Sequence, residues 1–173
     1  MLKTVIQILQ PYFLEMSPGW TLAAFGAALL TLAILEQRGH PHRYAISFTV
    51  LWLGLVYTST VLSRGISYER GWALMPLWSY GQWLQGNDVF QTYIVLNILM
   101  LLPVGVSLSS FCPTRRTVLL GFLFSCFIEC SQLLTGRGLF EIDDILHNTL
   151  GVYLGVLVYR GFCRLRAGGD AIG

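Results

Sequence analysis

The chain has 173 residues, of which 54% are hydrophobic and only 12% are charged. A soluble domain carries about a quarter charged residues, so this composition excludes an ordinary soluble protein and indicates an integral membrane protein. The formal net charge is +2 and the chain has no basic run, so the expected partner is membrane lipid and not nucleic acid.

The pattern of residues 1–16 predicts an amphipathic helix that lies at the membrane interface. Between residues 2 and 10, apolar side chains recur on one helical face and polar side chains on the other. Nine residues are too few to cross a bilayer, which takes about 20. Pro11 ends the helical pattern. A frayed polar terminus is the alternative interpretation of this segment.

The pattern of residues 17–162 predicts a single domain with an all-α membrane fold, which is a bundle of about five transmembrane helices. The apolar segments are Gly19–Leu35, Tyr44–Leu62, Val89–Leu108, Val118–Leu134 and Ile145–Phe162. An aromatic-rich loop, Ser63–Asp88, separates the second and third segments. Its tryptophans suit the headgroup layer, and a sugar-binding aromatic platform is the alternative. Residues 163–173 predict a cytoplasmic tail.

The cysteines and the loop histidines do not form a metal-binding pattern. None of the four cysteines belongs to a CxxC pair, and Cys126 and Cys130 lie one helical turn apart in an apolar segment. His40 and His42 lie two residues apart in a turn that contains proline, which suits a solvated loop. We therefore expect no metal and no cofactor.

The basic residues divide unevenly between the two sides of a five-helix topology. One side carries seven of them: Arg38, Arg43, Arg115, Arg116, Arg160, Arg164 and Arg166. The other side carries four: Lys3, Arg64, Arg70 and Arg137. The positive-inside rule therefore predicts the N-terminus outside and the C-terminus in the cytoplasm, and it places the loop 137–144 outside.

Polar side chains gather in the outer half of the last three predicted helices. At about 1.5 Å per residue, Asn97 lies roughly 12 Å deep in the third helix and Glu129 roughly 8 Å deep in the fourth. Asn148 lies one helical turn below Asp144 in the fifth. We therefore predict a polar pocket that opens outward. Its candidate lining residues are Asn97, Glu129, Gln132, Arg137, Asp143, Asp144, His147 and Asn148.

Small residues beside this pocket predict close helix packing. Gly151 and Gly155 form a GxxxG pattern on the same helical stripe as Asp144, which permits two helices to approach closely. Gly105 is a further packing position in the third helix. Pro103 has no N–H group to donate, so we expect it to bend that helix.

The buried acid Glu129 sets the chemistry of the predicted pocket. A charged carboxylate at mid-bilayer costs about 2.5–3.5 kcal/mol or more, so Glu129 must be protonated or paired, with Arg137 as the candidate partner. Such a cluster can bind a polar headgroup, or it can supply a general acid or base. A buried network that only fixes helix register is the structural alternative. The chain has neither an HExxH nor a GxSxG signature, so an enzyme is not favoured.

The same residues resemble the VanZ-like family of small bacterial membrane proteins over about residues 75–160. The resemblance rests on Asn97 to Gly105 with Pro103 between them, on Glu129-x-x-Gln132 followed by Arg137, and on Asp143-Asp144 followed by Asn148-Thr-Leu-Gly151 and Gly155. Met75-Pro76-Leu77-Trp78 is a weaker match. The chain departs from the family at Leu77, where Phe is frequent, and at His147, where an apolar residue is common.

The resemblance implies a multi-pass protein of the bacterial inner membrane. The family is named for a member associated with resistance to teicoplanin, a glycopeptide that acts at the cell wall. The resemblance implies no catalytic residues. We therefore expect recognition of an envelope component, such as a cell-wall precursor or a polysaccharide headgroup, that influences envelope assembly or glycopeptide susceptibility. The alternatives are an intramembrane enzyme acting on a lipid-linked substrate and a structural or partner subunit without a ligand site.

Overall fold

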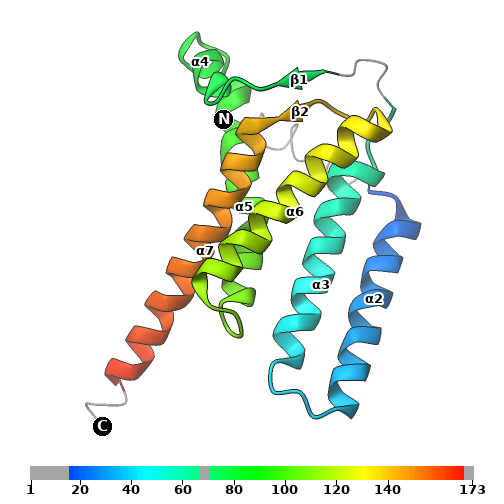
Figure 1. Ribbon diagram of the computed structural model, residues 1–173, viewed down its shortest axis with the longest axis vertical. Coiled ribbons are helices and arrows are strands. Elements are labelled where there is room, and N and C mark those ends of the chain that lie inside the picture. Colours follow the sequence, from blue (N-terminus) through cyan, green and yellow to red (C-terminus); the bar gives the residue numbers. More distant parts are fainter. Residues whose placement is uncertain (1–15, 67–70, 170–173) are drawn as a thin grey trace.

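Five long helices dominate the computed structural model, which describes residues 16–66 and 71–169. They run in alternating directions (Figure 1): α2 (Pro18–Gln37), α3 (Arg43–Tyr57), α5 (Asp88–Leu108), α6 (Thr114–Thr135) and α7 (Ile142–Gly169). The interfacial helix predicted for residues 1–16 lies outside the described residues except for Met16.

The shorter elements lie together at one end of the bundle, which we call the loop end (Figure 1). The π-helical turn η1 (Thr58–Leu62) continues α3, and the segment after it contains strand β1 (Trp72–Ala73) and helix α4 (Trp78–Leu84). Strand β2 (Phe140–Glu141) pairs in parallel with β1. The predicted aromatic-rich loop therefore contains a strand and a short helix. The opposite end, which we call the turn end, carries the turns 38–42 and 109–113.

Four helical stretches among the described residues are long and apolar enough to cross a membrane. They correspond to the first four predicted spans: Pro18–Gln37, Arg43–Leu62, Asp88–Leu108 and Thr114–Thr135. Helix α7 is not among them, although its 28 residues span about 42 Å. Polar residues occupy both its first two turns and its last turns. The prediction of about five spans is thus confirmed for four, and the fifth stays a prediction.

Helix α7 packs along α5 over the most extensive helix contact of the described residues. A Cβ atom added at Gly151 would overlap the carbonyl oxygen of Ile98, and one added at Gly105 would overlap that of Val152. Gly155 meets the α5 backbone in the same way. Glycine therefore lets the two backbones touch, so that Cα–H groups can approach carbonyl oxygens.

One apolar core joins α3, η1, α5, α6 and α7. Its buried side chains are Val56, Val61, Leu101, Val104, Leu108, Ile128 and Val152. The indole Nε1 of Trp52 donates a hydrogen bond of 2.8 Å to the carbonyl of Met100, which ties α3 to α5. Pro103 lies inside α5, which is continuous from Asp88 to Leu108. Helix α7 continues beyond the predicted end at Phe162, so residues 163–169 of the predicted tail are helical.

Candidate functional site

Three carboxylates from neighbouring elements meet at the loop end, and we call them the carboxylate cluster: Glu129 of α6, Glu141 of β2 and Asp144 of α7. The Oε2 atom of Glu129 accepts a hydrogen bond of 2.9 Å from the backbone N–H of Glu141. Asp144 Oδ1 accepts one of 2.5 Å from Asn97 Nδ2. When both are ionised, Glu129 and Asp144 repel each other. Glu129 is only 1% exposed, so this repulsion acts in a poorly solvated place.

Arg64 supplies the positive charge that faces the carboxylate cluster. Its guanidinium attracts all three carboxylates. Sequence reasoning placed Arg64 on the outer side but did not include it in the pocket, because an arginine just after a predicted span has no diagnostic spacing. Within the described part of the chain, one guanidinium thus faces three carboxylates, and the cluster keeps an excess of negative charge when these are ionised.

Glu141 is the one member of the carboxylate cluster that the predicted pocket residues did not include. It lies in the connection between α6 and α7, where helical periodicity gives no direction for a side chain. Burial raises the pKa of Glu141 above its ordinary value, and the nearby charge of Arg64 partly offsets that rise. Glu141 therefore holds a proton more readily than a solvated glutamate.

Arg137, the predicted partner of Glu129, instead caps a helix end. Its Nη1 atom donates to the backbone carbonyls of Val61 at 3.1 Å, Leu62 at 2.5 Å and Arg64 at 2.9 Å. These carbonyls lie at the end of η1, where no further N–H of the helix is available to them. A cation at this end also complements the helix dipole. Among the described residues, the guanidinium that acts on Glu129 is therefore that of Arg64, and Arg137 has a capping role instead of the predicted pairing.

Asp143 lies beside the cluster but faces α4. One of its oxygens accepts a hydrogen bond from the backbone N–H of Leu77, and the other accepts from the N–H of Ser79 at 2.9 Å and from its hydroxyl. Leu77 has a left-handed backbone with φ of 63°. The carboxylate satisfies free N–H groups at the start of α4, so it fastens the aromatic-rich segment to α7.

Two buried side chains of α7 have polar atoms without a hydrogen-bond partner among the described residues. Asn148 Nδ2 donates to Ser125 Oγ at 2.9 Å, while its Oδ1 atom has no partner. His147 Nε2 lies 3.2 Å from the hydroxyl of Tyr80, while its Nδ1 atom has no partner. Buried polar atoms are rarely left unpaired, and these two lie on adjacent residues that face different elements, His147 toward α4 and Asn148 toward α6.

The predicted pocket residues therefore divide by what they contact. Gln132 donates a hydrogen bond of 3.1 Å from Nε2 to the carbonyl of Thr60, and so holds α6 against η1. Gln132, Arg137 and Asp143 thus hold the surrounding elements in place, whereas Asn97, Glu129 and Asp144 form or touch the cluster. His147 and Asn148 carry the unpartnered atoms. No group of three or more His, Cys, Asp or Glu side chains among the described residues has the geometry to hold a metal ion.

Comparison with known proteins places this arrangement in a family. The family model described as VanZ/LLP1 matches residues 44–164, which is more than half of the chain. The chain belongs to the VanZ/LLP1 family. This confirms the VanZ-like resemblance, and the matched region begins earlier than the predicted 75–160, so that it includes α3, η1 and Arg64. No curated protein and no solved structure matches the chain significantly.

Proposed function

We propose that this VanZ/LLP1 protein binds the polar head of a cell-envelope molecule through Arg64 and the carboxylate cluster. The observation that carries the proposal is the gathering of three carboxylates around Arg64, with His147 and Asn148, which carry unpartnered buried atoms, in the same helix as Asp144. Burying charges and unpaired polar atoms among apolar helices costs free energy, so a cluster of this kind needs a compensating role. Ligand binding at the loop end supplies that role.

The chemistry of the cluster defines the class of ligand. Carboxylate oxygens accept hydrogen bonds from hydroxyl, amide and ammonium groups, and a guanidinium binds phosphate or carboxylate. A lipid-linked cell-wall precursor and a polysaccharide headgroup both present such donors, and the former also carries phosphate. We place the loop end at the outer face of the bacterial inner membrane, with the N-terminus outside and the C-terminus cytoplasmic. Such binding would influence envelope assembly or glycopeptide susceptibility.

A second candidate function is catalysis on a lipid-linked substrate. The presence of several carboxyl groups with different surroundings in one cluster favours it, because such groups can divide the roles of acid and base. A purely structural role suits Gln132, Arg137 and Asp143, whose contacts hold neighbouring elements together.

The experiment measures binding of a polyprenyl diphosphate-linked disaccharide to the protein in phosphatidylglycerol vesicles. We expect Glu129→Gln and Asp144→Asn each to weaken binding about tenfold, since each removes a charge-assisted hydrogen bond at little change in volume. Asp88→Asn is the matched control, because Asp88 is an exposed acid at the same end of the bundle. Its affinity should equal that of the unaltered protein.

Unchanged affinity in both Glu129→Gln and Asp144→Asn would end the proposal. Thermal unfolding of each variant, measured in the same detergent, separates lost binding from lost folding. Chromatography of the recovered probe separates the two candidate functions: an unaltered probe supports binding alone, and a cleaved or transferred headgroup supports catalysis.

A further inference from the structure

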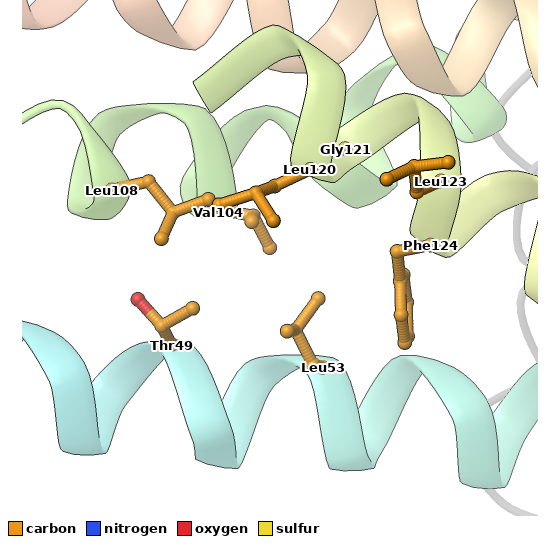
Figure 2. Close-up of a pocket in the computed structure, with 8 residues that line it drawn as sticks. All are labelled: Thr49, Leu53, Val104, Leu108, Leu120, Gly121, Leu123 and Phe124. Carbon is orange, nitrogen blue, oxygen red and sulfur yellow. The ribbon is translucent and has the colours of Figure 1, made fainter. Parts of the chain in front are cut away.

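An apolar cleft lies between α3 and α6, away from the carboxylate cluster. Helix α6 contacts η1 at the loop end, and the two long helices diverge from there toward the turn end (Figure 1). The cleft has a volume of about 340 Å³. In Figure 2, Leu53 of α3 lies across the cleft from Leu120 and Phe124 of α6, and Val104 of α5 lies beside Leu120.

The lining of the cleft selects an apolar occupant. Thr49 carries a lining hydroxyl, and this group is already hydrogen-bonded to the carbonyl of Ala45 and to Ser107 Oγ, both at 2.9 Å. The other lining atoms offer water no partners, so water would gain little there. The surrounding helices are apolar and long enough to cross a membrane, which makes hydrocarbon the medium outside the cleft. A volume at the low end for ligand sites accommodates a segment of one acyl chain.

Charges near the cleft indicate which lipid supplies that chain. Arg115 and Arg116 are exposed in the first turn of α6, and Arg116 precedes the lining residue Leu120 by one helical turn, about 6 Å. Arg43 at the start of α3 is already paired with Glu36 at 3.3 Å. The two α6 arginines can therefore hold a phosphate at the depth where a headgroup would sit.

We propose that this cleft binds one acyl chain of an anionic phospholipid from the leaflet at the turn end, with the phosphate at Arg115 and Arg116. The site is separate from the carboxylate cluster, which lies at the other end of the bundle, and it does not rest on the function proposed above. The lipid fills the space between the diverging helices and so fixes the α2–α3 hairpin against α6.

Native mass spectrometry of the full chain tests the proposal, with phosphatidylglycerol and phosphatidylcholine of matched acyl chains supplied in equal amounts. The unaltered protein should retain one phosphatidylglycerol through detergent exchange. Leu123→Trp places a larger side chain at the rim of the cleft and should lower retention of both lipids at least about tenfold, since an acyl segment loses its burial. Leu119→Trp is the control: Leu119 is 54% exposed on the same helix, close to the 52% of Leu123, but does not line the cleft.

The headgroup assignment has its own pair of variants. Arg115→Gln combined with Arg116→Gln should lower phosphatidylglycerol retention at least about tenfold and phosphatidylcholine retention much less, because the choline ammonium already offsets the charge of the phosphate in phosphatidylcholine. Arg160→Gln combined with Arg164→Gln is the matched control, because both arginines are exposed on α7. If the α6 pair and the α7 pair of substitutions leave the same preference for phosphatidylglycerol over phosphatidylcholine, the assignment of the phosphate to α6 is overturned.

Photo-crosslinking identifies the occupant directly. Photo-leucine, a diazirine analogue close to leucine in volume, replaces the leucines of the chain, and irradiation after detergent exchange should give an adduct with the mass of phosphatidylglycerol at Leu53, Leu120 or Leu123. A crosslinked dimer would show that a second copy of the chain fills the cleft, and so would overturn the proposal. Absence of any adduct would also overturn it, as would equal lipid retention by Leu123→Trp and the unaltered protein.

Discussion

The adjacent residues Asp143 and Asp144 have different partners. Asp143 accepts hydrogen bonds from the start of α4, whereas Asp144 accepts one from Asn97 and belongs to the carboxylate cluster. Successive residues of a helix point about 100° apart, so two neighbouring carboxylates of α7 face different elements. A pair of acids in a sequence motif can therefore combine one structural residue with one that is available to a ligand.

The role of Asp143 leads to a stability prediction. Asp143→Ala leaves the N–H groups of Leu77 and Ser79 and the Ser79 hydroxyl without their acceptor. Hydrogen bonds to a charged group contribute about 1.5–3 kcal/mol each, so we expect the free energy of unfolding to fall by about 3 kcal/mol or more. Thermal unfolding in detergent measures this. Asp88→Ala, at an exposed acid, should cost less than about 1 kcal/mol. Equal losses would contradict the capping role.

Helical geometry predicted part of this site and could not predict the rest. Depth and the 100° spacing placed Asn97, Glu129 and Asp144 at the same level of neighbouring helices, and the structure places them at the loop end. Arg64 and Glu141 follow or precede helices, where the path of the chain is set by tertiary contacts. For that reason the sequence did not distinguish Arg64, which faces the carboxylates, from Arg137, which caps η1.

At the scale of elements, hydrophobic length predicted the helices and gave no indication of the short segments. The four spans confirmed here are long apolar runs, for which length and composition suffice. Strands β1 and β2 have two residues each, which is too short for any periodic signal. The π-helical turn η1 ends on carbonyls that Arg137 satisfies from 73 or more residues away, and local sequence does not reveal such a partner.

The contact between α5 and α7 gives a prediction for glycine. In Gly151→Ala the added Cβ overlaps the carbonyl of Ile98, so the helices must separate, and we expect a loss of about 2 kcal/mol or more. Gly161→Ala is the matched control in the same helix, with no atom within 4 Å of the added Cβ. It should gain roughly 0.5–1 kcal/mol, because alanine favours a helix over glycine. Unfolding in detergent measures both, and a loss at both positions would argue against the backbone contact.

At the scale of the whole molecule, the alternating helices put the loop end and the turn end on opposite faces of the membrane. In a variant without native cysteines, we expect Leu139→Cys to react with a membrane-impermeant maleimide in intact cells. Pro41→Cys should react only after permeabilisation, because the turn end carries more arginines and is the end that we propose faces the cytoplasm. Residue 139 is 37% exposed, so its label tests access and not unfolding. The reverse pattern would place the carboxylate cluster on the cytoplasmic side.

The pairing of β1 with β2 constrains the order in which the protein matures. Trp72 pairs with Phe140, and helices α5 and α6 lie between these two residues in the chain. The ribosome therefore releases the β1 segment two helices ahead of its strand partner, and the Asp143 that fastens α4 emerges later still. Docking of this segment is consequently a late event, which completes the loop end only after the fourth long helix has been synthesised.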